Sequence, residues 1–167
     1  MRVFIAACCL AVALTAEAAT RPGSFTDITE ATGLAFRHVN GRSGRKYFIE
    51  PLGSGIALLD YDGDGDLDVY AVNGSALPGV EYLPTPRNAL FRNDGSGRFV
   101  DVTDTAGVGD TGYGLGCAVA DYDGDGHVDI YVTNYGPNVL YRNRGDGTFE
   151  DVAHGVGVAG DDLSASC

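Results

Sequence analysis

The sequence predicts an all-β protein that is built from repeated four-stranded units. Three observations predict it. The 167 residues include 25 glycines, spread between short apolar runs, and this pattern indicates many tight turns. Two aspartate-rich strings of nearly the same sequence occupy residues 60–70 and 121–131. The segments that follow these strings also match one another, and such self-similarity is the signature of a repeat protein.

The repeat is clearest after the aspartate strings. "FRNDGSGRFVDVTDTAGV" (91–108) aligns with "YRNRGDGTFEDVAHGVGV" (141–158) at an offset of 50, with nine of eighteen positions identical. "FTDITEATGL" (25–34) is a third copy of the second half of this unit. Each unit therefore runs from an F-x-D-[VI] segment through the aspartate string to N-x-L-[FY]-R-N and a glycine-rich turn.

Alternating apolar residues on either side of these turns predict four strands in each unit. A unit of 50 to 61 residues with four strands has the scale of a β-propeller blade. A β-sandwich also has short strands, but it does not repeat its sequence at this period. The expected strands lie in residues 55–62, 67–74, 88–93, 98–103, 116–123, 128–134, 138–143 and 148–153.

The first unit carries two insertions, "HVNGRSGRKYFIEPLG" (38–53) and "SALPGVEYLPTP" (75–86). Insertions at such junctions map to loops on one face of a repeat protein. No linker separates the units. We therefore expect a single region of β-propeller repeats over residues 19–167, with two full blades and the start of a third.

Residues 1–18 have the layout of a secretory signal peptide. A short positive start precedes an apolar run over residues 3–14, and Ala16-Glu17-Ala18 offers a cleavage site. About twelve apolar residues are too few for a membrane anchor, and a lipoprotein site at Cys8 lacks a preceding apolar stretch. We expect a secreted or periplasmic protein that is not inserted in the membrane after cleavage. Cys167 is the repeat counterpart of Cys117, so we expect no disulfide between them.

The net charge of −12 argues against nucleic acid and anionic membrane surfaces as partners, because both require a basic patch. The aspartate strings account for much of this charge and carry the candidate site. Counting each string from its first aspartate, acidic residues recur at positions 1, 3, 5 and 9, with glycine at position 6. The candidate ligands are Asp60, Asp62, Asp64, Asp66 and Asp68 in the first string and Asp121, Asp123, Asp125, His127 and Asp129 in the second.

Alternating carboxylates on a tight loop supply the six to eight oxygens that Ca²⁺ prefers. Because position 7 is Asp66 in one string and His127 in the other, we expect its backbone carbonyl to be the ligand, as in the EF-hand loop. The strings are not EF-hands, since position 12 is Ala71 or Val132 rather than Glu, and Asp68 and Asp129 must close the shell.

The repulsion among these carboxylates also favours a metal. Two carboxylates about 5 Å apart repel by about 1 kcal/mol in water and about 3 kcal/mol at an effective dielectric near 20. Turn preference alone explains one or two aspartates in a loop, but not four in the same register twice. We predict two Ca²⁺ sites, and prefer Ca²⁺ to Mg²⁺ because of the number of ligands.

Together these segments resemble FG-GAP/VCBS-type repeats. More narrowly, they resemble the amino-terminal part of cartilage acidic protein-like (ASPIC/UnbV-associated) exported proteins. The resemblance covers nearly all of residues 25–167. It implies a propeller of about seven blades when complete, with Ca²⁺ between the first two strands of a blade, and it implies no established catalytic activity. We therefore expect this chain to be a fragment of a larger propeller, whose remaining blades continue beyond Cys167.

Three functions remain open, and the third of them is a structural array with no dedicated ligand. The first is a non-catalytic calcium-binding scaffold for adhesion or for binding an extracellular protein or glycan. The alternative is a fragment of an extracytoplasmic propeller enzyme, a sugar lyase, hydrolase or dehydrogenase, with its active site outside this segment.

Other residues give weaker signals. The three histidines are scattered along the sequence, and Ser54 lacks the glycine pattern of a nucleophile elbow. Asn73 begins a glycosylation sequon.

Overall fold

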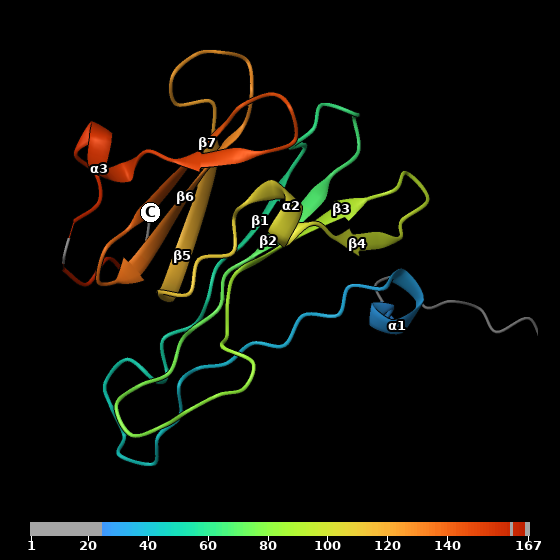
Figure 1. The fold of residues 1–167 in the computed structure, drawn as a ribbon. Helices are drawn as coiled ribbons and strands as arrows, with labels where there is room; N and C mark the ends of the chain where they lie inside the picture. Colours follow the sequence, from blue (N-terminus) through green and yellow to red (C-terminus); the bar gives the residue numbers. More distant parts are fainter. Residues whose placement is uncertain (1–24, 161, 166–167) are drawn as a thin grey trace, which may run out of the picture.

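The computed structural model describes residues 25–160 and 162–165, so the expected signal peptide at 1–18 lies outside the described residues. The fold is all-β, with two four-stranded antiparallel sheets in which each strand pairs with the next along the chain (Figure 1). The first sheet consists of β1 (Ile56–Leu59), β2 (Asp68–Ala71), β3 (Ala89–Asn93) and β4 (Phe99–Asp101). The second consists of β5 (Tyr113–Ala120), β6 (Asp129–Tyr135), β7 (Val139–Asn143) and β8 (Phe149–Asp151).

The two sheets repeat the same register, and all eight expected strands are confirmed. Leu59 pairs with Asp68 across the first aspartate loop, as Ala120 pairs with Asp129 across the second. Asn93 pairs with Phe99 across the hairpin turn, as Asn143 pairs with Phe149. The sequence repeat is therefore a structural repeat, with each aspartate string between the first two strands of its sheet.

The main core lies between the two sheets. Tyr70 and Leu90 of the first sheet pack with Ile130 and Val132 of the second, and all four side chains are fully buried. The opposite face of the first sheet is covered by Leu34 and its neighbours from the amino-terminal segment. Leu34 aligns with Val108 in the sequence repeat, and Val108 packs in the core beside the second sheet.

Two glycines allow β5 to approach the first sheet closely. A Cβ on Gly55 would lie 2.7 Å from the backbone nitrogen of Cys117, and one on Gly114 would lie 2.3 Å from Val72 Cγ1. Any side chain at these positions would push the sheets apart. Cys117 is half-buried against the core between the sheets, while Cys167 lies outside the described residues.

Three short helices were not expected from the sequence. They are α1 (Thr29–Thr32), α2 (Thr103–Ala106) and α3 (Ala153–Val156), and each follows an F-x-D segment. The aspartate of that segment accepts a hydrogen bond from the backbone N–H two residues later, as Asp101 does from Thr103 at 2.9 Å. Each helix ends at a glycine with a left-handed backbone, such as Gly107 at φ 76°.

The two insertions of the first unit pack against each other at the end of the sheets opposite to the aspartate loops (Figure 1). Ile49 and Leu77, one from each insertion, form a small core with Tyr113 and Leu115 of β5. The Tyr113 hydroxyl donates to the carbonyl of Asn40 at 2.6 Å. Among the described residues, no helix has the length and apolar character needed to cross a bilayer.

Replacing Tyr70 with Phe should destabilise the fold without disturbing its packing. The buried Tyr70 hydroxyl donates to the carbonyl of Val108 at 3.0 Å, so the substitution leaves a buried acceptor unpaired. We expect a loss of about 1–3 kcal/mol in the free energy of unfolding, measured by urea denaturation.

The matched control is Tyr131→Phe. The Tyr131 hydroxyl also donates to a backbone carbonyl, that of Val158, but at a more exposed position, and it accepts a further hydrogen bond from the side chain of Asn138. Loss of this hydroxyl should lower the free energy of unfolding by less than Tyr70→Phe does, because water can replace it at the more exposed position. Equal losses for the two variants would contradict the view that burial between the sheets sets the difference.

Candidate metal centre

The first aspartate of each string organises its loop. Asp60 Oδ1 accepts hydrogen bonds from the backbone N–H groups of Gly63 and Asp64 at 2.9 and 3.1 Å, and its Oδ2 accepts one from Gly65 at 3.0 Å. These bonds curl the chain around the carboxylate and require the left-handed backbone of Gly65, at φ 91°. The same three bonds reach Asp121 from Gly124, Asp125 and Gly126.

The last aspartate of each string joins the loop to the sheet. Asp68 is fully buried, and its two oxygens accept from the backbone N–H groups of Tyr61 at 3.1 Å and Asn93 at 2.8 Å. Asp68 therefore connects the start of the loop, the start of β2 and the end of β3. Its counterpart Asp129 accepts in the same way from Tyr122 at 2.9 Å and Asn143 at 2.8 Å.

The loops bring carboxylate oxygens close together. Oxygens of Asp60, Asp62 and Asp64 lie within 4.8 Å of one another in the first loop. In the second loop the oxygens that converge to the same extent belong to Asp121, Asp123 and Asp129. Positions 1 and 3 thus converge in both loops. Position 5 joins them in the first loop, and position 9 joins them in the second.

The side chain at position 7 faces the neighbouring hairpin turn. A Cβ on Gly95, in the β3–β4 turn, would lie 2.9 Å from Oδ2 of Asp66. A Cβ on Gly145, in the β7–β8 turn, would lie 2.5 Å from Nε2 of His127. Neither Asp66 nor His127 belongs to the carboxylate groups described above. This placement is compatible with a ligand role for the backbone carbonyl of position 7.

The asparagine that ends the third strand of each sheet was not among the predicted site residues. Besides its backbone bond to Asp68, Asn93 donates from its side chain to the carbonyl of Leu67 at 3.2 Å, and its Oδ1 accepts from Gly95 at 3.1 Å. Asn143 makes the same contacts in the second sheet. The signal was present in the sequence, because both N-x-L-[FY]-R-N segments end in this residue.

Both loops are strongly acidic. None of the three ion pairs among the described residues involves a loop carboxylate. Burial raises the pKa of the Asp68 carboxyl above its ordinary value, against the opposing effect of its two N–H donors. The backbone N–H groups that point at Asp121, that of Gly126 foremost, lower the pKa of that carboxyl. The loops therefore concentrate negative charge, and among the described residues no ion pair with a basic side chain offsets it.

The oxygens present fit a hard divalent cation. Oxygens on opposite sides of one Ca²⁺ lie about 4.6–5.2 Å apart, twice the usual Ca–O distance, and the converging oxygens fall within this span. Carboxylate and carbonyl oxygens are the donors that Ca²⁺ and Mg²⁺ share, whereas His and Cys ligands typical of zinc are absent from both groups.

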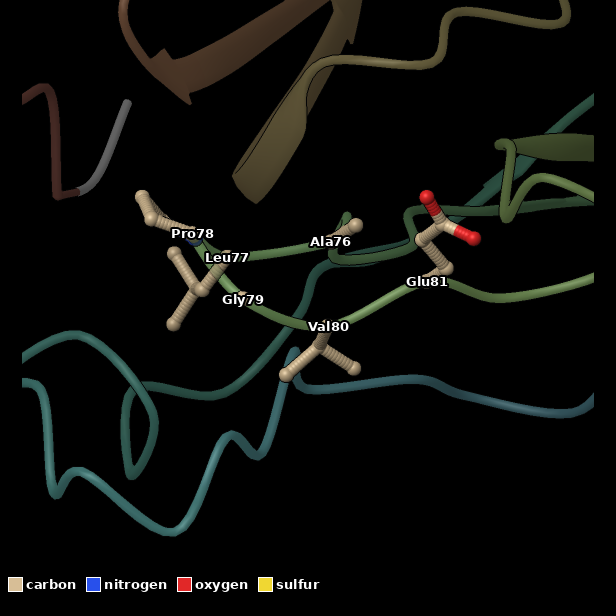
Figure 2. Close-up of a pocket in the computed structure, with 6 residues that line it drawn as sticks. All are labelled: Ala76, Leu77, Pro78, Gly79, Val80 and Glu81. Carbon is tan, nitrogen blue, oxygen red and sulfur yellow. The ribbon is translucent and has the colours of Figure 1, made fainter.

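Other features of the surface offer less chemistry. Figure 2 shows a hollow lined by the consecutive residues Ala76–Glu81 in the second insertion, where Glu81 is the one charged side chain. Asn73, which begins the sequon, is only 5% exposed. Its side chain accepts from the N–H of Val39 at 2.7 Å and donates to the carbonyl of Arg37 at 3.3 Å. The folded chain therefore does not present this amide to a glycosylating enzyme.

Substitutions in metal-free protein should separate the aspartates that hold the fold from those that only add charge. Asp68→Asn exchanges an acceptor oxygen for a donor opposite a backbone N–H, so we expect a loss of about 1–3 kcal/mol in unfolding free energy in EDTA. Asp62 is exposed and accepts no hydrogen bond within the described part of the chain. Asp62→Asn should therefore either raise the free energy of unfolding or lower it by no more than about 0.5 kcal/mol. Equal losses in chemical denaturation would contradict this division.

Comparison with known proteins agrees with this geometry. A family model described as FG-GAP-like repeat matches residues 60–132 and 121–166. Cartilage acidic protein 1 of Xenopus tropicalis is 47% identical over 53 residues, and that of Mus musculus is 49% identical over 53 residues. Each match covers 30% of this chain and 8% of the relative, so the chain spans only a small part of their length. Because the family model covers more than half of the sequence and includes both aspartate loops, the chain belongs to the FG-GAP-like repeat family.

Proposed function

We propose that this chain is an exported calcium-binding repeat module that acts as a binding or adhesion scaffold. The observation that carries the proposal is the double occurrence of one loop geometry. Two strings 61 residues apart fold into the same turn, with the same backbone bonds to the first and last aspartates. In each, oxygens from three carboxylates converge. Such duplication supports a shared requirement rather than a chance cluster of surface charge.

Each loop would hold one Ca²⁺ through its side-chain oxygens and the backbone carbonyl at position 7. The ion would supply positive charge and rigidity rather than chemistry on a substrate. The residues that would hold it are Asp60, Asp62, Asp64, Asp68 and the carbonyl of Asp66 in the first loop, and Asp121, Asp123, Asp125, Asp129 and the carbonyl of His127 in the second.

The two sheets are adjacent blades of a β-propeller in this proposal. The packing of the first sheet on the second supports it. Ala57, Leu59 and Tyr61 of the first unit are buried against the second sheet. Their counterparts Ala118, Ala120 and Tyr122 are exposed. A further unit of the same kind, from the rest of a longer parent chain, would cover this face as the second sheet covers the first.

A scaffold role agrees better with these features than catalysis does. The conspicuous polar groups belong to the two loops, where they serve the backbone and a cation. The partner is proposed to be an extracellular protein or glycan, because the acidic surface disfavours nucleic acid. We propose no enzymatic activity for this segment.

Calcium titration tests the proposal directly. Isothermal titration calorimetry of the folded chain should show two Ca²⁺ bound, with dissociation constants of roughly 10⁻⁴–10⁻³ M, as in other extracellular modules. Calcium at about 100 times Kd should stabilise the fold by about 2.7 kcal/mol per site, so EGTA should lower the Tm.

Asp62→Asn combined with Asp123→Asn should abolish uptake at both sites. His127→Ala should leave the second site nearly intact, since its side chain faces the hairpin turn, and it serves as the control. A folded protein that takes up no Ca²⁺ would refute the proposal.

The open face of the second sheet should make the chain self-associate. Exposed apolar residues beside unpaired strand edges favour association, and repeat folds need neighbouring units to bury their faces. Sedimentation velocity in Ca²⁺ should therefore show mass rising with protein concentration. Ala118→Asp should reduce association, whereas Val100→Asp, at an exposed position on β4, should not. A monomer at every concentration would show that this face needs no cover.

A further inference from the structure

The first aspartate loop forms part of the contact between the two sheets. Tyr61 follows Asp60, the first residue of the loop, and is only 7% exposed. Its ring stacks on Phe149 of β8, with ring centroids 6.2 Å apart and planes at 26°. Its carbonyl accepts a hydrogen bond from the side chain of Asn143 at 2.8 Å. Its N–H donates to Asp68, the last aspartate of the same loop. One residue therefore contacts both the candidate site and the second sheet.

The equivalent residue of the second loop has no such contacts. Tyr122 donates its N–H to Asp129 as Tyr61 does to Asp68. Tyr122 itself, however, is 41% exposed. Within the described part of the chain, its carbonyl accepts no hydrogen bond and its ring stacks on no other ring. The two loops thus share their acidic residues but differ in what supports them.

Asn143 connects the two loops across the interface. Its side-chain nitrogen donates to the carbonyl of Tyr61 in the first loop and to that of Val128 at the end of the second, at 2.8 and 3.2 Å. Its backbone N–H donates to Asp129 at 2.8 Å. Its counterpart Asn93 donates from its side chain only within its own unit, to Leu67. The bond from Asn143 to Tyr61 spans 82 residues of sequence.

We propose that Tyr61, held by Phe149 and Asn143, is a positioning residue that couples calcium affinity in the first loop to the packing of the second sheet. The inference rests on the proposed calcium binding. A loop that is already ordered loses less conformational entropy when it binds a ligand. While the face that carries Tyr122 is uncovered, as in this structure, the first loop therefore binds Ca²⁺ more tightly than the second. By thermodynamic reciprocity, Ca²⁺ in the first loop strengthens the contact between the sheets.

The experiment isolates each loop and then weakens the link. Asp123→Asn leaves only the first loop competent, and Asp62→Asn leaves only the second. Phe149→Leu is added to each background, because it removes the ring stack and keeps an apolar side chain in the core. Calorimetry with Ca²⁺ alone gives Kd, and the Tm gained in Ca²⁺ relative to EDTA gives a second readout.

With only the first loop competent, Phe149→Leu should weaken Ca²⁺ binding about tenfold, within the usual range of coupling between sites. With only the second loop competent, it should change Kd less than about twofold. Tyr61→Leu should reproduce the tenfold loss in the first loop, while its counterpart Tyr122→Leu should leave the second loop unchanged. A shift of equal size in both loops, or no shift in the first, would overturn the coupling while leaving calcium binding itself in place.

The two loops also differ in charge at position 7, which is Asp66 in the first loop and His127 in the second. This difference alone would strengthen Ca²⁺ binding in the first loop. Asp66→His, made with only the first loop competent, matches the loops at this position. The first loop should still bind more tightly than the second after this change. Equal affinities would attribute the difference to charge and overturn the inference. If neither background takes up Ca²⁺, both the proposed calcium binding and the coupling through Tyr61 are refuted.

Discussion

A buried aspartate at the start of the second strand of each sheet is the constraint on which the rest of the structure depends. Asp68 and Asp129 each accept one backbone N–H from the loop before them and one from the end of the third strand. Without this carboxylate, two donors in a closely packed region would lack a partner, at a cost of about 1–3 kcal/mol each. The aspartate therefore fixes the loop to two strands at once, and the loop must take one shape.

That shape determines where the other carboxylates lie. With both ends of the loop held, three backbone N–H groups turn inward onto Asp60 or Asp121. The carboxylate of Asp62 then lies close to that of Asp60, and the carboxylate of Asp123 close to that of Asp121. Neither Asp62 nor Asp123 accepts a hydrogen bond within the described residues. Within the part of the chain that the structure describes, no ion pair with a basic side chain relieves their mutual repulsion. The fold thus tolerates a concentration of charge that a cation would stabilise.

Spacing and alternation were sufficient to predict the strands and the acidic residues of both loops. The period of two is visible even in strands of four residues, and glycines mark the turns between them. The helices α1, α2 and α3 were missed, because four residues are too few to show a helical period. Asn93 and Asn143 were also missed, since an asparagine at a strand end has many uses and only the folded sheet shows which backbone groups it reaches.

The sequence by itself determined the repeat, the four strands of each unit and the position of the aspartate loops, because local spacing governs all three. Only the tertiary structure decided which copies of a residue become buried. Tyr61 and Tyr122 occupy the same place in their units, yet one lies between the sheets and the other is exposed. The two insertions likewise pack together and enclose Asn73 next to them. Such outcomes depend on which distant segments of the chain pack against each other. The sequence around a residue does not show which segment will cover it.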